Sequence, residues 1–337
     1  MVDRVGYRGV NVNTLTPVFL LVTAIPVSMF MWVGNIAFSI LKPGPDEVIP
    51  PTRWLAATLI PLAFAAWGLR KGTISKSGAL LGFIVGFILT LASYCFLACL
   101  IVFFVTSSKA AKFKDRAKKK LAHDFKEGAQ RNWIQVLCNG GMAAQLALLY
   151  LLDSGTGERP INFTMDYRAS WLAIGVLGSF ACANADTWAS ELGTVLSSTD
   201  PWLITSGKKV PKGVNGGVSI IGLVMSFLGG LVIGIGYYLS VIYSSDGKAL
   251  LESPVQWPVI PIAALAGFMG SLLDSVLGAT LQYSGKHKKT GVVVEHSGPD
   301  IIYISGRRIL DNNSVNFLST IIIGLVTPKF ANAVWPY

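Results

Sequence analysis

The sequence lacks the ingredients of several common protein classes. Charged residues make up 14% of its 337 residues, whereas a soluble domain carries about 25%. Its four cysteines and three histidines form no C-x-x-C or His-rich arrangement, so neither a disulfide framework nor a zinc site is indicated. It contains no G-x-x-x-x-G-K-[ST] loop, the signature of P-loop ATPases, and no polar segment long enough to fold as a nucleic-acid-binding domain.

The chain is instead rich in apolar residues. Hydrophobic residues make up 52% of it, and the mean hydropathy is +0.55. Several apolar runs approach the ~20 residues that an α-helix needs to cross a bilayer. The sequence therefore predicts an all-α, polytopic membrane helix bundle, one integral membrane domain over residues 1–337, with about nine transmembrane helices and a range of about seven to ten. The expected spans are 17–40, 54–68, 78–91, 92–105, 133–152, 170–186, 216–243, 259–283 and 315–335.

The apolar run 78–105 leaves the topology open, because it is too long for one upright span and short for two. If it is a hairpin, the segments 70–76, 107–132, 190–215 and 284–313 share one side with the N-terminus and hold most of the 28 Lys and Arg residues. The positive-inside rule then makes that side, and the N-terminus, cytoplasmic. If the run is one tilted helix, the segments upstream of it change sides.

The net charge of +10 follows mostly from this topology. The basic cluster at 112–120 is typical of a surface that faces anionic lipid headgroups. We expect an integral multi-pass membrane protein of the endoplasmic reticulum or another endomembrane.

Two carboxylates and two hydroxyls follow a long apolar run, in the segment NADTWASELG at 184–193. An ionised side chain at membrane depth costs roughly 2.5–3.5 kcal/mol, so a chain that keeps Asp186 and Glu191 there is expected to use them. In a helix, Asp186, Ser190 and Gly193 share one face, which predicts catalytic side chains and a carboxylate for Mg²⁺. The alternative is that both acids form buried salt bridges with basic loop residues.

A lysine- and glycine-rich turn, KKVPKGVNGG at 208–217, leads into the apolar run 216–243. Glycines let backbone amides approach an anion, and a helix N-terminus directs N–H groups at it. Lysine adds positive charge, and Asn215 is the predicted N-cap. These features predict a phosphate-binding turn, and the alternative is an ordinary basic loop before a capped helix. The residues assigned to the turn are Lys209, Lys212, Asn215, Gly216 and Gly217.

Other polar residues stand in or next to the last two apolar runs. Asp274 lies in a stripe of small residues at 267–278, which predicts a catalytic, Mg²⁺-binding carboxylate or, alternatively, one interhelical hydrogen bond. Asp311 is either a helix N-cap or a third Mg²⁺ ligand. Asn312 and Asn313, which follow it, are predicted phosphate ligands.

Arg131 and Asn132 stand at the start of the run 133–152 and are also predicted to bind phosphate. A guanidinium can hold a phosphate through two parallel hydrogen bonds; the alternative is that Arg131 anchors the helix. Together, these groups predict a Mg²⁺-supported polyphosphate site at one membrane surface, because phosphoryl transfer depends chiefly on positioning, metal and positive charge. The acceptor would be a lipid whose tail lies between helices.

Several of these segments, with others along the chain, carry a resemblance to a known family. They are EGAQRNW (127–133), 141–150, DTWASELG (186–193), LIT (203–205), VP (210–211), NGGV (215–218), QWP (256–258), LDS (273–275), LGAT (277–280) and LDNN (310–313). Over essentially its whole length the chain resembles the transmembrane protein 19 family. That family is related to plant and cyanobacterial phytyl-phosphate kinases, which make prenyl diphosphates from prenyl monophosphates with CTP, and more distantly to dolichol and phytol kinases.

The resemblance implies roles for particular residues. By it, Asp186 corresponds to the aspartate that binds nucleotide and metal, and the residues assigned to the turn correspond to the triphosphate segment. VPKGVN at 210–215 stands where the distant kinases have a Lys-Ser/Thr-x-Glu-Gly turn, and it lacks the Glu.

We therefore expect a membrane prenyl- or polyprenyl-phosphate kinase that acts at the cytoplasmic face with Mg²⁺ as its cofactor. The expected partners are CTP or another nucleoside triphosphate, a prenyl or polyprenyl monophosphate, membrane lipid and a second copy of the chain, but no nucleic acid. A transporter of a phosphorylated lipid or small anion is the first alternative, because Gly-rich helices and intramembrane acids fit that class too. A non-catalytic membrane scaffold is the second. Acids at one membrane face rather than at the midplane favour the enzyme.

Overall fold

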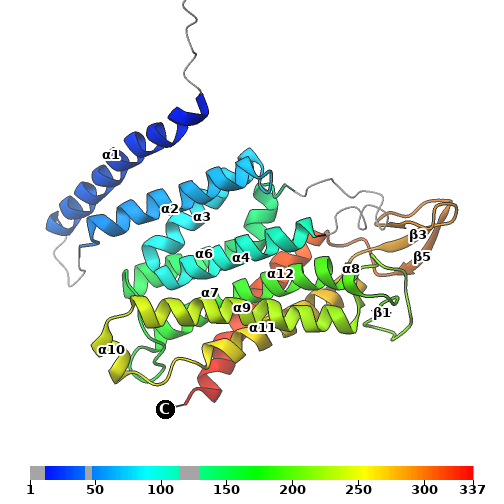
Figure 1. The fold of residues 1–337 in the computed structure, drawn as a ribbon. Helices are drawn as coiled ribbons and strands as arrows, with labels where there is room; N and C mark the ends of the chain where they lie inside the picture. The colour runs from blue at the N-terminus through cyan, green and yellow to red at the C-terminus, as the bar shows by residue number, and fades with distance from the viewer. Residues whose placement is uncertain (1–11, 42–47, 114–129, 337) are drawn as a thin grey trace, which may run out of the picture.

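Nine helices of 17 to 30 residues dominate the computed structural model, which describes residues 12–41, 48–113 and 130–336 (Figure 1). They are α1 (Val12–Leu41), α2 (Pro51–Arg70), α3 (Lys76–Ala92), α4 (Tyr94–Lys112), α6 (Trp133–Ser154), α7 (Tyr167–Trp188), α9 (Ile220–Ser244), α11 (Val259–Leu281) and α12 (Asn312–Val334). The shorter helical pieces are η1 (Ala189–Gly193), α8 (Thr194–Leu196) and α10 (Gly247–Glu252). The strands are β1 (Trp202–Leu203), β2 (Gly217–Val218), β3 (Ser284–His287), β4 (Val293–Val294) and β5 (Ile301–Ser305).

The long helices coincide with the predicted apolar runs, and the all-α membrane class is confirmed. Within the described ranges, six of them, α2, α4, α6, α9, α11 and α12, are long and apolar enough to cross a bilayer. The number of helices that cross it and the side on which the N-terminus lies stay predictions.

The apolar run 78–105 folds as two helices. α3 and α4 are separated only by Ser93, which has an extended backbone and whose hydroxyl accepts a hydrogen bond from the Cys95 amide at 3.2 Å. The end of α4 lies against the loop before α3, because Lys112 Nζ donates to the carbonyl of Lys71, the residue that follows α2, at 2.6 Å. The two-helix alternative is therefore confirmed, and the loops on either side of the hairpin share one end of the bundle.

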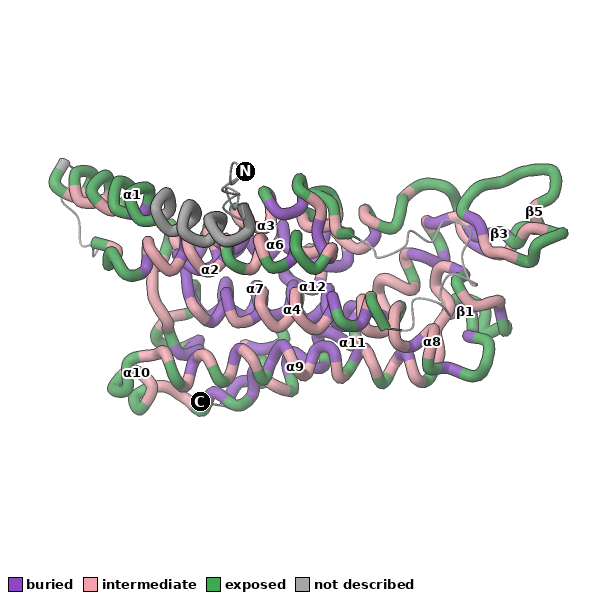
Figure 2. The backbone as a smooth tube through the Cα atoms, turned by 45° about the horizontal axis from the view of Figure 1, so that its top comes forward, coloured by how far each residue is buried: buried purple, intermediate pink, exposed green. Residues whose placement is uncertain are grey.

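α7 is the central helix, with α4, α6, α9, α11 and α12 packed around it; Figure 2 shows the buried backbone concentrated in the middle of the bundle. Small residues allow close packing: a Cβ added to Gly267 of α11 would lie 2.8 Å from the Cα of Gly230 in α9. Asn184 is fully buried, accepts from the Thr106 hydroxyl at 3.0 Å and donates to the Gly229 carbonyl at 2.7 Å. Asn184 therefore ties α7 to α4 and α9.

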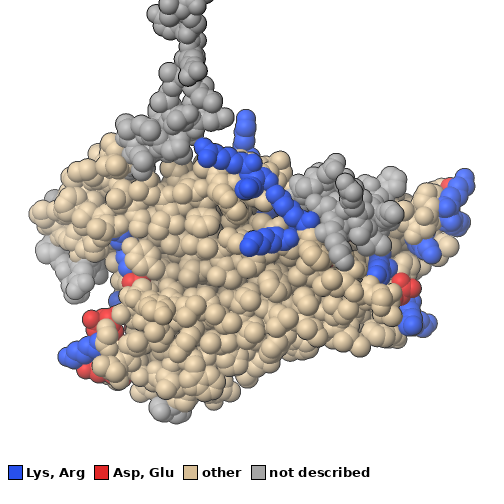
Figure 3. All heavy atoms as spheres, viewed as in Figure 1, with Lys and Arg blue, Asp and Glu red and all other residues tan. Residues whose placement is uncertain are grey.

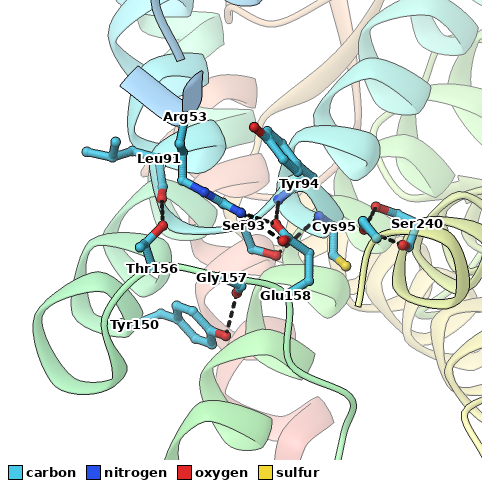
Figure 4. Close-up of polar contacts among 11 residues, drawn as sticks. Arg53, Leu91, Ser93, Tyr94, Cys95, Tyr150, Thr156, Gly157, Glu158 and Ser240 are labelled. Carbon is cyan, nitrogen blue, oxygen red and sulfur yellow. Dashed lines mark hydrogen bonds and ion pairs between the residues drawn. The ribbon is translucent and has the colours of Figure 1, made fainter. Parts of the chain in front are cut away.

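A buried ion pair lies at the end of the bundle that holds the α3–α4 junction (Figure 4). Arg53 Nη2 donates to both carboxylate oxygens of Glu158, at 2.9 and 2.7 Å. Their side chains are only 9% and 8% exposed. The Tyr94 amide also donates to Glu158, at 2.8 Å, and the Arg53 guanidinium lies 4.3 Å from the centroid of the Tyr94 ring. These contacts tie α2 and α4 to the loop between α6 and α7.

Two small sheets lie at the opposite end, at the right of Figure 1. β1 pairs with β2, and β3 pairs with both β4 and β5, all antiparallel. The sequence did not predict these strands, although β-branched residues at 292–294 and 301–304 favour them. Figure 3 shows many of the visible Lys and Arg side chains toward this end. The two ends of the bundle therefore differ in both structure and charge.

Candidate functional site

A cavity of about 440 Å³ opens among the helix ends at the sheet end of the bundle. α4, α6, α7, η1, α9, α11 and α12 contribute to its wall, and the loop 197–219 closes one side. Its volume lies within the range of small-molecule sites, about 300–1,000 Å³. The predicted site residues that line it are Arg131, Asp186, Ser190, Glu191, Lys212, Asn215, Gly216, Gly217, Asp274 and Asn312.

Two carboxylates reach this cavity, that of Asp186 from the last turn of α7 and that of Asp274 from about two turns before the end of α11. Among the described residues Asp186 has no hydrogen-bond or ion-pair partner, so the salt-bridge alternative does not apply to it there. Asp274 accepts from the Ser319 hydroxyl at 3.3 Å. With the Asn316 amide turned so that its nitrogen donates, it accepts from Asn316 at 3.1 Å. Both contacts fall on Oδ2, and neither uses Oδ1.

η1 carries the rest of the predicted acidic motif as a π-helical turn that continues α7. The π-helix is rare and is often found at functional sites. Ser190 and Glu191 both line the cavity, and the Ser190 hydroxyl donates to the Thr187 carbonyl at 3.2 Å. Gly193 packs against α9, since a Cβ there would lie 2.6 Å from the Cα of Gly222. The motif is therefore helical as predicted, but its wider turn changes the spacing of the residues around the helix.

Arg131 brings a guanidinium to the cavity from the segment before α6. Its backbone is held by the α2–α3 loop, because its amide donates to the Thr73 carbonyl at 3.1 Å and its carbonyl accepts from the Ser75 amide at 3.0 Å. The guanidinium makes a long contact to Ser108 Oγ at 3.5 Å and lies 5.1 Å from the centroid of the Phe103 ring. Burial lowers the pKa of Arg131 to about 10, so it remains cationic at pH 7. Among the described residues, neither Asp186 nor Asp274 forms an ion pair with it.

Lys112 and Lys212 add two ammonium groups. Each is held to the wall by a backbone carbonyl, that of Lys71 for Lys112 and that of Ser197 for Lys212. Lys112 belongs to the basic cluster 112–120 that was predicted to face lipid, whereas the structure places it at the cavity; residues 114–120 lie outside the described residues. The cavity thus gathers three cationic side chains and three carboxylates.

The glycine-rich turn differs from its prediction. α9 begins at Ile220, and its N-cap is Ser219, whose hydroxyl accepts from the Gly222 amide at 3.0 Å; the prediction of Asn215 as N-cap is wrong. Gly217 lies in β2, and its amide is bonded to the Val214 carbonyl at 3.0 Å, so it does not project from a helix start.

The left-handed backbone of Gly216 turns the chain against α11. Its φ is +79°, and a Cβ there would lie 2.5 Å from the Ser275 carbonyl oxygen and 2.4 Å from the Ala279 Cβ. Only glycine fits such a position without strain. Gly216 and Gly217 therefore shape the cavity wall, and the prediction that they form a helix N-terminus is wrong.

Four predicted ligands do not line the cavity. Asn132 forms a capping box with Gln135 at the start of α6. Asp311 caps α12 by accepting from the Ser314 amide at 2.8 Å, and these hydrogen bonds lower the pKa of its carboxyl. The remaining two are Lys209, which is exposed beside β1, and Asn313, in the first turn of α12.

The prediction of Asp311 as a third metal ligand is therefore not supported by the geometry. Within the described ranges, no group of three or more His, Cys, Asp or Glu side chains could hold a metal ion. A Mg²⁺ site in this cavity would have to rest on Asp186 and Asp274 together with oxygens from water or substrate.

Several cavity residues had no local signal in the sequence. They are Thr73, Lys112, Gln135, Ser219, Gln282 and Asn316. Asn316 follows Asn312 by one helical turn, so the pair could have been found once α12 was known to begin at Asn312. The others come to the cavity from separate elements, and only the packing of the bundle brings them together.

Comparison with known proteins places the chain among integral membrane proteins. The family model described as integral membrane protein DUF92 matches residues 59–324. Protein PGR of Arabidopsis thaliana is 39% identical over 281 residues, which cover 83% of this chain and 97% of the relative. The uncharacterized membrane protein MJ0933 of Methanocaldococcus jannaschii is 27% identical over 278 residues, which cover 81% of this chain and 92% of the relative. No solved structure matches the chain.

Proposed function

We propose, from the premise that the chain belongs to the DUF92 family of integral membrane proteins, that it is a membrane prenyl- or polyprenyl-phosphate kinase. It transfers the γ-phosphoryl group of CTP, or of another nucleoside triphosphate, to a lipid monophosphate and uses Mg²⁺ as its cofactor. The resemblance to the transmembrane protein 19 family and the phytyl-phosphate kinases supports this assignment. We place the protein in the endoplasmic reticulum or another endomembrane, with the cavity facing the cytoplasm.

Unneutralised charge of both signs in one cavity is the observation that carries the proposal. Asp186 has no hydrogen-bond or ion-pair partner among the described residues, and neither Asp186 nor Asp274 pairs with Lys112, Arg131 or Lys212. Unpaired charges in a confined site are costly unless a ligand neutralises them. A polyphosphate would neutralise the Lys and Arg side chains, and a divalent cation would neutralise the carboxylates.

The reaction itself asks little covalent chemistry of the protein. An oxygen of the lipid monophosphate attacks the γ-phosphorus and forms a new P–O bond, while the bond from that phosphorus to the bridging oxygen breaks. The nucleoside diphosphate leaves with that electron pair. The monophosphate is already ionised at pH 7, so no general base is required. Lys112, Arg131 and Lys212 offset the negative charge of the phosphoryl oxygens throughout.

The pair Asp186 and Asp274 fits Mg²⁺. Proteins usually hold this ion through one or two carboxylates, with waters and substrate phosphates as the other ligands. Both acids line the cavity, and the described contacts of Asp274 leave Oδ1 unused. Bound there, Mg²⁺ supplies positive charge to the phosphate oxygens. Ser190 and Glu191 stand on the same wall, and the Ser190 hydroxyl can donate to a phosphate oxygen if it turns away from the Thr187 carbonyl.

The position of the cavity argues for an interfacial enzyme rather than a transporter. Transporter sites lie near the bilayer midplane, at breaks in helices. Here Asp186 lies in the last turn of α7 and Asp274 lies about two turns before the end of α11, and the cavity is closed by the loop 197–219 at the end of the bundle. A site at this depth can receive a water-soluble nucleotide from one side and a lipid headgroup from the other.

A transfer assay tests the proposal. Purified protein in lipid nanodiscs is incubated with Mg²⁺, with γ-labelled CTP, ATP, GTP or UTP, and with geranyl, farnesyl or geranylgeranyl monophosphate. We expect label in a prenyl diphosphate for at least one pair, formed at least ~10²-fold more slowly by the Asp186→Asn variant. Absence of labelled diphosphate from every pair would contradict the kinase. Movement of a lipid monophosphate or anion across vesicles containing the protein, without such a product, would support the transporter instead.

A further inference from the structure

A second, apolar groove lies between α2, α3, α4 and α6. It has a volume of about 70 Å³, and almost all of its lining is apolar. Its wall includes Pro61, Phe64, Leu100, Phe104 and Val136. The groove differs in chemistry from the charged cavity and is formed mainly by helices that contribute little to that cavity.

The groove and the charged cavity share Arg131 and Gln135. These are also the polar residues of the groove lining, whose other members are apolar or glycine. The guanidinium of Arg131 lies 5.1 Å from the centroid of the Phe103 ring, and Phe103 belongs to the groove wall. Arg131 therefore stands at the boundary, with an apolar channel on one side and the phosphate-binding groups on the other.

We propose that this groove binds the hydrocarbon chain of the lipid monophosphate acceptor, with the phosphate at Arg131. The inference rests on the proposed function and adds to it the place and the direction of the acceptor. The apolar wall of the groove suits the hydrocarbon chain of the acceptor, and the positive charge of Arg131 at its end suits the negative charge of the acceptor phosphate. Arg131 accordingly binds the acceptor phosphate, while Lys112 and Lys212 are left for the nucleotide.

The size of the groove sets which part of the acceptor it recognises. Its volume of about 70 Å³ is far below the roughly 300–1,000 Å³ of a site that encloses a whole small molecule. It therefore holds the carbons next to the phosphate, and the rest of the chain lies in the bilayer. On this inference the enzyme distinguishes acceptors by the carbons next to the phosphate and tolerates different total chain lengths.

Two glycines in the wall allow the groove to be filled without a backbone clash. A Cβ added to Gly82 of α3 would lie 3.5 Å from Ile74 Cδ1, and one added to Gly140 of α6 would lie 3.6 Å from Val85 Cγ1. Both are ordinary contacts, and neither residue lines the charged cavity. Gly34 of α1 is the matched control, because nothing lies within 4 Å of a Cβ there.

The test compares Gly82→Leu, Gly140→Leu and the control Gly34→Leu with the parent protein in nanodiscs. Equilibrium binding of geranyl monophosphate and of CTP is measured separately, and a diazirine analogue of geranyl monophosphate is photo-crosslinked and mapped by mass spectrometry. We expect the groove variants to bind geranyl monophosphate at least about tenfold more weakly, the scale on which one methylene matters in an apolar pocket. CTP binding stays unchanged, and the crosslinks fall in α2, α3, α4 or α6.

The outcomes separate this inference from the proposed function. Groove variants that bind and phosphorylate geranyl monophosphate like the parent would overturn the groove and leave the kinase standing. A parent protein that crosslinks in the groove but transfers phosphate from no nucleotide would overturn the kinase and leave the groove standing. A parent protein that binds no prenyl monophosphate, or crosslinks only outside these four helices, would overturn the inference.

Discussion

Asp186 carries a carboxylate that the described part of the bundle does not neutralise. Such a group costs stability at membrane depth, and the cost is offset only when a cation arrives. Asp274, in contrast, is held by Ser319 and Asn316 of α12. The two acids therefore differ. Asp274 lines the cavity and is also hydrogen-bonded to α12, whereas Asp186 only lines the cavity.

Asp186→Asn is expected to separate activity from stability. The substitution keeps the size of the side chain and removes its charge, so the transfer rate should fall at least ~10²-fold, as for other lost electrostatic groups. The melting temperature should not fall, because no described partner is lost. Transfer assays and thermal unfolding of the purified variant measure both quantities.

Asp300→Asn is the matched control, since Asp300 is exposed and does not line the cavity. It should leave rate and melting temperature unchanged. An active Asp186→Asn protein would remove Asp186 from the site, and an aggregating one would favour a structural role for its charge.

Lys212 and Lys209 give a second comparison, within one loop. Lys212 lines the cavity, whereas Lys209 is exposed beside β1. Lys212→Ala should raise the apparent KM for the nucleotide about tenfold, as expected for loss of one charge-assisted hydrogen bond of about 1.5–3 kcal/mol. Lys209→Ala should leave it unchanged. Steady-state kinetics with varied nucleotide check this, and equal effects of the two substitutions would show that the cavity does not bind the triphosphate.

At the scale of elements, the ion pair of Arg53 and Glu158 holds α2 and α4 to the loop between α6 and α7. Glu158→Gln leaves a buried guanidinium without its counter-charge, and Arg53 Nη1 already has no partner. Removal of one partner of a buried pair costs about 3–5 kcal/mol. We expect a decrease of that size in the free energy of unfolding, measured by denaturant titration in mixed micelles.

The exposed pair of Arg168 and Asp153 is the control for this prediction. Its N–O distance is 2.9 Å, but its side chains are 79% and 32% exposed. Asp153→Asn should cost only about 0–1 kcal/mol. The double variant Arg53→Met, Glu158→Leu should recover most of the lost stability, because no unpaired charge remains. A small effect of Glu158→Gln, equal to that of Asp153→Asn, would contradict the interpretation.

The positions of the long helices could be predicted because bilayer-length apolar runs have few alternative structures. Their ends could not be placed as well. The start of α9 shifted from Gly216 to Ile220, since the left-handed turn at Gly216 and the pairing of β1 with β2 depend on contacts with distant segments. β3 and β5 were missed for the same reason: short strands become stable only when paired.

The candidate site was partly predictable for a different reason. Acids such as Asp186 and Asp274 conflict with their apolar surroundings, so the sequence alone marks them. Lys112 and Gln282 lie in ordinary polar segments and reach the cavity only through tertiary packing. Asn132 and Asp311 satisfied a phosphate or metal pattern, yet they cap helices, because capping and ligand binding require the same side chains.

On the scale of the whole molecule, the bundle has two different ends. The charged cavity, the small sheets and the loops around Lys71 and Arg131 lie at one end. The ion pair of Arg53 and α10 lie at the other. The positive-inside rule predicts that the first end faces the cytoplasm, where nucleoside triphosphates are abundant. The proposed function therefore requires this orientation, because the cavity must face the nucleotide. The orientation can be measured without an activity assay.

The natural residues are poorly suited to report this orientation. Asn162 belongs to a glycosylation sequon at the end with the ion pair, but it is only 8% exposed and its side chain accepts from the amides of Thr164 and Met165. All four native cysteines are buried, so an introduced cysteine at an exposed position is a cleaner reporter. Leu251 in α10 is 89% exposed, and Thr290, in the turn between β3 and β4, is exposed at the opposite end.

We predict that Thr290→Cys and Leu251→Cys are labelled from opposite sides of the membrane. In cells whose plasma membrane alone is permeabilised, a membrane-impermeant maleimide should label Thr290→Cys and spare Leu251→Cys; dissolving all membranes in detergent should expose both. The parent protein, with buried cysteines only, is the control. Reversed labelling would overturn the cytoplasmic assignment and place the cavity away from the nucleotide, which would favour the transporter. Labelling of both from one side would mean that the two ends of the bundle do not lie across the bilayer.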